Sequence, residues 1–102
     1  MLIVLTTVAS AEEAAALAQK SVELKLAACV QILPQMTSVY FWKGEVRKEP
    51  EQLLLIKTLP EKWDELCEFI NLHHSYDVPE IIAIQVERVS EVYANWIADY
   101  LK

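Results

Sequence analysis

The order of two amphipathic segments among runs of β-branched residues limits the fold more than any other sequence feature. The first apolar run covers Leu2 to Ala9, and a Ser-x-x-Glu capping-box pattern follows it at Ser10. We therefore expect a strand followed by a helix that begins at Ser10, with Glu13 completing the cap, and runs to about Leu26. The apolar stripe expected on this helix is rich in alanine and comprises Ala11, Ala14, Ala15, Leu17, Ala18, Val22 and Leu26.

A long β-hairpin is predicted next, because β-like runs at Cys29 to Trp42 and Glu45 to Thr58 flank Gly44, the one glycine of the chain. Glycine supplies the positive φ of a tight turn. Pro34 should bend the first strand or mark a bulge, because it cannot donate to the ladder. The 14 residues from Cys29 to Trp42 would span about 46 Å, against about 34 Å for a compact domain of this size, so the hairpin should overhang.

The second half of the chain repeats the strand-helix alternation. A capping-box spacing at Thr58 to Glu61 predicts a helix that runs to about His73, followed by a strand from Glu80 to Val89. Ser90 is expected to cap a final helix. The apolar positions of the two helices are Trp63, Leu66, Cys67 and Ile70 in the first, and Tyr93, Trp96, Ile97, Tyr100 and Leu101 in the second.

This order predicts an α+β fold: one domain over residues 1–102, a ferredoxin-like βαββαβ sandwich with an added C-terminal helix and a long hairpin between its second and third strands, 29–42 and 45–58. Three strand segments, 2–9, 53–56 and 81–84, are apolar at both alternating positions. The sheet face without helices therefore needs a cover, supplied either by the aromatic final helix or by another copy of the chain. The overhanging hairpin favours another copy, because its edges and aromatic tip would otherwise be free.

Charge and apolar run lengths exclude several classes of partner. With 15 acidic and 9 basic residues the formal charge is −6, which disfavours nucleic acid because phosphate binding needs a positive surface. No apolar run approaches the roughly 20 residues of a membrane span. We expect a soluble, cytoplasmic protein without membrane contact, whose two cysteines are buried free thiols because they form no Cys-x-x-Cys pattern.

Three stretches and the Asn95-Trp96-Ile97 triplet together resemble the CutA divalent-ion tolerance family over nearly the whole chain. The stretches are Ala27-Ala28-Cys29-Val30 with Ile32-Leu33-Pro34, Thr37-Ser38-Val39-Tyr40 with Trp42-Lys43-Gly44-Glu45, and His74-Ser75-Tyr76-Asp77-Val78-Pro79-Glu80-Ile81-Ile82. The resemblance implies a ferredoxin-like protomer and an interlocked homotrimer shaped like the PII signalling proteins. It also implies a role in tolerance of copper and other divalent ions.

Few residues of the chain could ligate copper, which prefers thiolate, thioether and imidazole donors. The resemblance implies a thiol at the end of the first strand, where this chain has Thr6, and histidines at His73 and His74. Our candidate metal ligands are therefore His73, His74 and Cys29, and they would hold copper or another divalent metal weakly. The metal is not expected to be required for folding.

Each candidate ligand also has a simpler structural interpretation. Adjacent histidines near a helix end point in different directions, and a buried imidazole usually finds a local hydrogen bond, so the sequence favours a structural role for His74. Cys29 and Cys67 both suit a small buried hydrophobic position. Glu80 and Glu87 are most simply solvated charges at strand ends.

Motifs of hydrolases, metalloproteases and phosphate-binding loops are absent, so we expect no enzyme activity. One alternative function is a trimeric PII-like sensor that binds an anionic small molecule in the clefts between subunits, with Lys43, Arg47 and Lys48 as the only basic group nearby. Another is a structural trimer that acts as a scaffold. Titration with copper and with nucleotide would separate these three functions.

Overall fold

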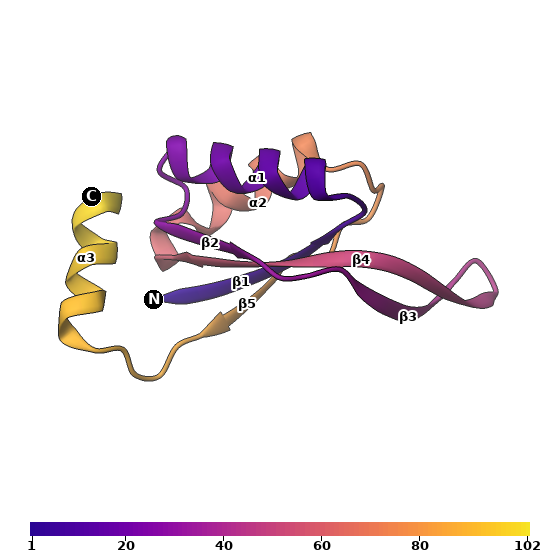
Figure 1. Ribbon diagram of the computed structural model, residues 1–102. Helices are drawn as coiled ribbons and strands as arrows, with labels where there is room; N and C mark the ends of the chain where they lie inside the picture. Colours follow the sequence, from indigo (N-terminus) through magenta and orange to yellow (C-terminus); the bar gives the residue numbers. More distant parts are fainter.

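The computed structural model describes residues 1–102 and contains a sheet of five strands with three α-helices (Figure 1). The strands are β1 (Leu2–Val8), β2 (Cys29–Ile32), β3 (Met36–Trp42), β4 (Glu45–Thr58) and β5 (Ile82–Gln85). The helices are α1 (Ala11–Glu23), α2 (Trp63–His73) and α3 (Glu91–Leu101), and a short 3-10 turn, η1 (Pro60–Lys62), precedes α2.

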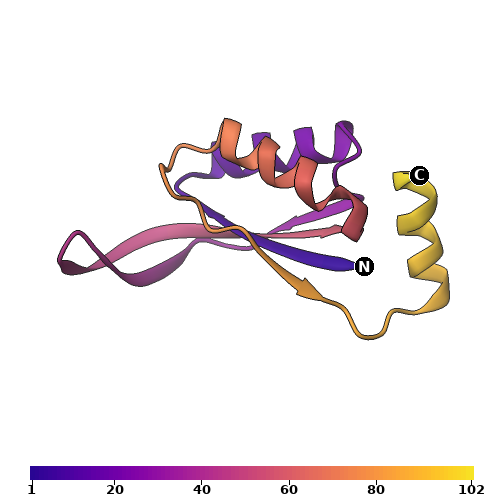
Figure 2. The same cartoon turned by 180° about the vertical axis from the view of Figure 1, so that it is seen from behind.

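The sheet is antiparallel with the order β2-β4-β1-β5, and β3 continues the hairpin by pairing with the first half of β4. The helices α1 and α2 lie side by side on one face of the sheet (Figures 1 and 2). This arrangement confirms the predicted ferredoxin-like α+β fold with its additional C-terminal helix.

The hydrophobic core lies between the sheet and these two helices. Val4 pairs with Ile56 across β1 and β4, and both side chains are buried. They pack in one cluster with Leu17 of α1 and with Leu66 and Ile70 of α2. Alternate residues of the central strands thus supply the interior, as expected from side chains that point to opposite faces of a sheet.

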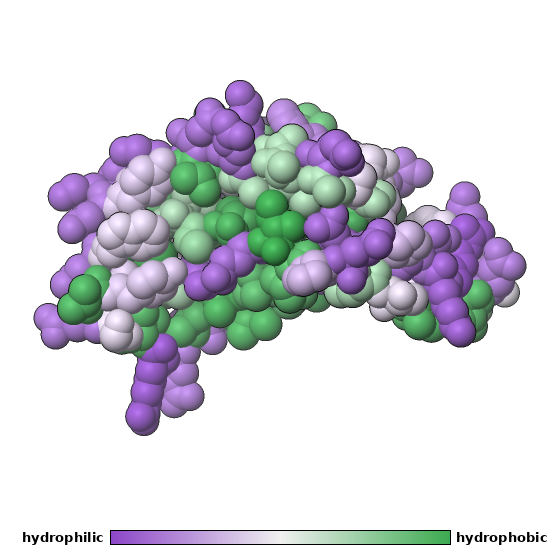
Figure 3. All heavy atoms as spheres, viewed as in Figure 1, coloured by the Kyte–Doolittle hydropathy of each residue, from purple (hydrophilic) through white to green (hydrophobic).

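The opposite face of the sheet is apolar but is not covered by any helix of the same chain. The pairing registers place six apolar residues on it: Ile3, Leu5, Leu53, Leu55, Ile82 and Ile84. Ile82 and Ile84 are about half exposed, at 48% and 50%. Apolar surface continues along the side of the sheet away from the helices in Figure 3.

The C-terminal helix α3 does not cover this face, although its aromatic stripe made it a candidate. It stands at the end of the sheet (Figure 1), where Ile97 and Leu101 pack against Ala28. The sequence left two possibilities for covering the helix-free face, the final helix or another copy of the chain. The position of α3 excludes the first.

The hairpin extends beyond the helices, and the longest dimension of the molecule is 45 Å (Figure 1). Leu33, Pro34 and Gln35 separate β2 from β3, as predicted for a proline that cannot join a ladder. Gly44 at the tip has φ +82°, and the preceding Lys43 is also left-handed at +50°. Phe41 near the tip is 70% exposed.

Two of the three predicted helix caps are confirmed, because the amides of Glu13 and Tyr93 donate to the hydroxyls of Ser10 and Ser90. The cap predicted at Thr58 is wrong, since no side chain caps η1. The Thr58 hydroxyl donates instead to the Leu26 carbonyl over 2.6 Å, inside the core.

Three boundaries or faces differ from the sequence expectations. The helix α1 ends at Glu23, because Lys25 adopts a left-handed φ of 58°. Ala14 and Leu17 of the predicted stripe are buried together with Ser21, whereas Ala11 and Ala15 are exposed. The predicted strand from Glu80 to Val89 shrinks to Ile82–Gln85. At its C-terminal end this strand stops at Gln85, because Gln85 pairs with Leu2, the first residue of β1.

None of the helices is both long enough and apolar enough to cross a membrane.

Candidate functional site

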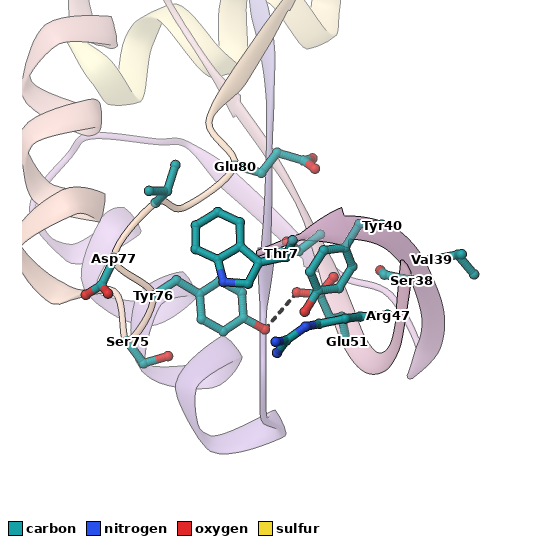
Figure 4. A pocket seen from close by; sticks show the side chains of 12 residues that line it. Thr7, Ser38, Val39, Tyr40, Arg47, Glu51, Ser75, Tyr76, Asp77 and Glu80 are labelled. Atoms are coloured by element: carbon teal, nitrogen blue, oxygen red, sulfur yellow. Dashed lines mark hydrogen bonds between the residues drawn. The ribbon is translucent and has the colours of Figure 1, made fainter. Parts of the chain in front are cut away.

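A cleft of about 680 Å³ opens where the hairpin leaves the body of the protein (Figure 4). Three segments form it: the end of β1, the paired strands β3 and β4, and the loop between α2 and β5. The lining residues are Thr7, Ser38, Val39, Tyr40, Trp42, Arg47, Glu51, Ser75, Tyr76, Asp77, Val78 and Glu80.

The centre of the cleft is a hydrogen bond between two side chains that lie far apart in the sequence. The hydroxyl of Tyr76 donates to the Glu51 carboxylate over 2.7 Å (Figure 4). Glu51 is only 7% exposed. Burial, and then the Glu51 carboxylate that accepts its proton, raise the pKa of the Tyr76 hydroxyl, so this hydroxyl remains a donor at neutral pH.

Further carboxylates make the cleft acidic. Asp77 and Glu80 line it together with Glu51. Partial burial and, secondly, the charge of Glu51 raise the pKa of Glu80. With three carboxylates and one guanidinium group in its lining, the cleft favours a positively charged ligand over an anionic one.

Arg47 is the one basic residue in the lining, and its guanidinium group lies near the Tyr76–Glu51 hydrogen bond (Figure 4) while also pairing with a carboxylate outside the cleft. Its Nη2 atom lies 3.1 Å from the Glu45 carboxylate, nearer the hairpin tip. Its Nε is buried and has no hydrogen-bond acceptor. Lys43 and Lys48, the other members of the predicted basic group, are exposed and do not line the cleft.

The loop that carries Tyr76 is held in place by His74 and Glu13. The amide and hydroxyl of Ser75 both donate to the Glu13 carboxylate over 2.9 Å. Burial would raise the pKa of Glu13, but the two hydrogen bonds from Ser75, with a longer one from the Ala9 amide, outweigh it and lower this pKa. The Glu13 side chain, which was expected to complete the cap of α1 at Ser10, therefore connects α1 to the 74–80 loop.

His74 uses both of its ring nitrogens for hydrogen bonds to the backbone. Its Nε2 lies 2.7 Å from the Thr7 carbonyl, and the Tyr76 amide donates to Nδ1 over 3.0 Å. A carbonyl can only accept and an amide N–H can only donate, so Nε2 carries the proton and the imidazole is neutral. The structural role favoured for His74 is confirmed.

The other predicted metal ligands lie apart from this network. His73, at the end of α2, is exposed and packs edge-on against the Phe69 ring at 4.5 Å. Cys29 opens β2 and is half-buried. No group of three or more His, Cys, Asp or Glu side chains within the chain could hold a metal ion. His73, His74 and Cys29 thus do not form a ligand set by themselves.

Both cysteines are free, as predicted, but they are half-buried rather than buried. Burial, and then the nearby charge of Asp64, raise the pKa of the Cys67 thiol. Thr6 is fully buried at the position where the resemblance implied a thiol, and its Oγ1 has no hydrogen-bond partner. A threonine hydroxyl there cannot replace a thiolate ligand.

Sequence reasoning missed Glu51 and the cleft as a whole, and it treated Glu80 as a solvated strand-end charge. No local pattern marks Glu51, because it lies in the polar half of β4 between Pro50 and Gln52. The Tyr76 side chain meets it only because the loop 74–80 is anchored beside the hairpin, and pattern spacing does not show such a contact.

The fold and cleft together define a ferredoxin-like α+β protein with a ligand-sized cavity at the base of a projecting hairpin. The sequence pattern of the CutA1 divalent ion tolerance protein family matches residues 2–100. The chain belongs to this family.

Individual relatives agree with this assignment. The divalent-cation tolerance protein CutA of Thermus thermophilus is 42% identical over 97 residues, which cover 95% of this chain and 94% of that protein. The chloroplastic protein CutA of Arabidopsis thaliana is 43% identical over 96 residues, and the match covers 94% of this chain. The chain spans about half of the length of that plant protein, 53%.

Solved structures of the family superpose closely on the chain. CutA1 from Oryza sativa has a TM-score of 0.96 at 39% identity, with 99% of this chain and 93% of that chain covered. The periplasmic divalent cation tolerance protein CutA from Archaeoglobus fulgidus also has a TM-score of 0.96, at 34% identity, and the match covers 100% of both chains.

Proposed function

We propose that this protein acts in divalent-cation tolerance as a non-enzymatic homotrimer that holds copper or another divalent metal weakly. The observation that carries the proposal is the match of residues 2–100 to the CutA1 family, together with relatives whose names describe divalent-cation tolerance. The cytoplasmic location expected from the sequence stays a prediction, because the named relatives include chloroplastic and periplasmic proteins.

Assembly of identical chains is supported by the uncovered face of the sheet. Six apolar residues lie on that face, and the exposed side chains of Phe41 and Val46 near the hairpin tip, outside the cleft, add further apolar surface. An exposed apolar patch of this kind on a small protein marks a contact surface. Sedimentation equilibrium of the full chain at micromolar concentration should report the mass of three chains, and a single-chain mass would contradict the proposal.

Metal binding is proposed to use His73 and Cys29 together with donors from a neighbouring copy, because one chain lacks a complete set of ligands. His74 would contribute only if its two backbone hydrogen bonds were broken. We therefore expect weak binding rather than the tight binding of a closed site built from one chain.

Calorimetric titration of the metal-stripped protein with Cu²⁺ tests this assignment. His73→Ala should reduce the binding heat, whereas Asn71→Ala, a neighbouring exposed position on α2, should leave it unchanged. His74→Ala should lower thermal stability first, because it removes two hydrogen bonds to the backbone. Absence of copper binding to the wild-type protein would overturn the metal proposal.

A second candidate function, a small-molecule sensor, is supported by the cleft at the base of the hairpin. Its volume of about 680 Å³ lies within the range of about 300 to 1,000 Å³ that is usual for ligand pockets. A ligand held there would contact both the hairpin and the 74–80 loop, so its binding could change the position of the hairpin. Calorimetric titration with small molecules of opposite charge tests this function.

A further inference from the structure

The cleft contains a carboxylate whose negative charge has no cationic partner. Glu51 is only 7% exposed, and no Lys, Arg or His side chain forms an ion pair with it. The hydroxyl of Tyr76 is its one side-chain donor, and that donor is neutral. Buried charges are normally paired, because leaving water costs an ion several kcal/mol.

The rest of the lining does not neutralise this charge. Asp77 and Glu80 add two carboxylates, while Arg47 is the only basic residue and pairs with Glu45 outside the lining. The anionic ligand expected from the sequence would meet this excess of negative charge. A cation would instead be attracted by the three carboxylates of the lining.

Three aromatic side chains, Tyr40, Trp42 and Tyr76, line the same cleft. Tyr40 and Trp42 remain 40% and 39% exposed, so their ring surfaces are available to a ligand. Aromatic faces attract cations within about 6 Å of the ring centre, and the attraction is strongest for tryptophan. The combination of rings and carboxylates suits a positively charged group on a carbon skeleton.

A bare metal ion fits this lining less well. Divalent metals need several convergent oxygen or nitrogen ligands, and no such group of three exists in the chain. The aromatic rings would also contribute little to a hydrated metal ion, whereas they would pack against carbon atoms.

We propose that the cleft binds a small organic ammonium ion, with its charged nitrogen at Glu51 and its carbon chain against Trp42 and Tyr40. This inference names the ligand class of the sensor function proposed above and rests on that function. It is independent of the copper ligands, none of which lines the cleft.

The test is calorimetric titration of the full chain with butylammonium, and with butyrate as a probe of similar size and opposite charge. Butylammonium should bind and butyrate should not. Glu51→Gln removes the charge but keeps an oxygen that accepts the Tyr76 hydroxyl, and it should weaken butylammonium binding roughly tenfold or more. The matched control Glu49→Gln removes the same charge two residues away on β4, at an exposed position outside the lining, and should leave binding unchanged.

A second pair of variants covers the case in which Glu51→Gln fails to fold. Trp42→Leu should weaken butylammonium binding roughly threefold or more by removing an aromatic face. Phe41→Leu, on the neighbouring residue outside the lining, should have no effect. Equal loss in the members of either pair would overturn the assignment of the site.

The outcomes also separate this inference from the function on which it rests. If butyrate binds and butylammonium does not, the sensor function stands and the ammonium class is wrong. If neither cationic nor anionic probes bind, both are wrong, while the copper titration still decides the metal function separately.

Discussion

The two faces of the central sheet have similar apolar side chains but opposite surroundings. Leu54 and Leu55 are neighbours on β4, yet Leu54 is fully buried beneath the helices while Leu55 points to the face that no helix covers. On the covered face the chain completes its own core. On the open face it provides apolar surface for which it has no cover, so apolar composition alone does not distinguish an interior from an interface.

The largest effect that tests this comparison is expected from Leu54→Ala. Deletion of this buried side chain should lower the free energy of unfolding by about 2–5 kcal/mol, because it leaves a cavity beneath the helices. The matched variant Leu55→Ala should lower the free energy of unfolding of the single chain by less, but it should weaken assembly. Urea denaturation with sedimentation measures both, and equal losses for the two variants would break the distinction between the faces.

A charge on the open face is the next test. Ile84→Glu places a carboxylate on β5 at a position that is half exposed in one chain. If another copy covers this face, the variant should sediment as a single chain, because a carboxylate cannot be buried there without a partner. Circular dichroism should show that the fold persists, and an unchanged assembly mass would show that the face is not an interface.

Two threonines sharpen the description of the covered face. The Thr58 hydroxyl donates to the Leu26 carbonyl, whereas the Thr6 hydroxyl is buried without a partner. Thr58→Val should therefore lower the free energy of unfolding by about 1–3 kcal/mol, while Thr6→Val should be neutral or stabilising. Thermal denaturation compares them, and a larger loss for Thr6→Val would mean that its hydroxyl has a partner in solution.

The smallest expected effect concerns pH and the tie between α1 and the 74–80 loop. The pKa of Glu13 in the folded protein is below its ordinary value of 4.5, so its stabilisation is present above about pH 4.5 and is lost as the pH falls. The wild type should lose more stability than Glu13→Gln between about pH 6 and about pH 3. If urea denaturation gave the wild type and Glu13→Gln the same change in stability with pH, the contacts between Glu13 and the 74–80 loop would contribute nothing to stability.

The parts of the fold that depend on local patterns could be predicted from the sequence. Glu45 and Thr58 are the observed ends of β4, Gly44 occupies the turn, and Ser10 and Ser90 cap their helices. These features depend on residues that are close in the sequence and on the alternation of apolar and polar positions along the strands. The uncovered face was also predictable, because apolar residues at both alternating positions leave one face to be covered.

Features that depend on contacts between distant segments could not be predicted in the same way. The hydroxyl of Thr58 matched a capping pattern but found the Leu26 carbonyl, which is 32 residues away. Glu13 similarly bonds to Ser75, and Glu51 meets Tyr76 only when the loop and hairpin are side by side. The cleft consists almost entirely of such contacts, which explains why its acidic and aromatic character was missed.

The strand β4 belongs to both parts of the molecule, since residues 45–51 pair only with β3 in the projecting hairpin while residues 52–58 pair with β1 in the sheet. A two-stranded ribbon has little stability in isolation. In a lone chain the amide hydrogens of Val46 and Lys48 would consequently exchange with deuterium much faster than those of Leu54 and Ile56. Slow exchange along the entire strand would mean that a neighbouring copy protects the ribbon. Comparing the exchange rates of the two halves of β4 within one sample would therefore report whether the chains associate.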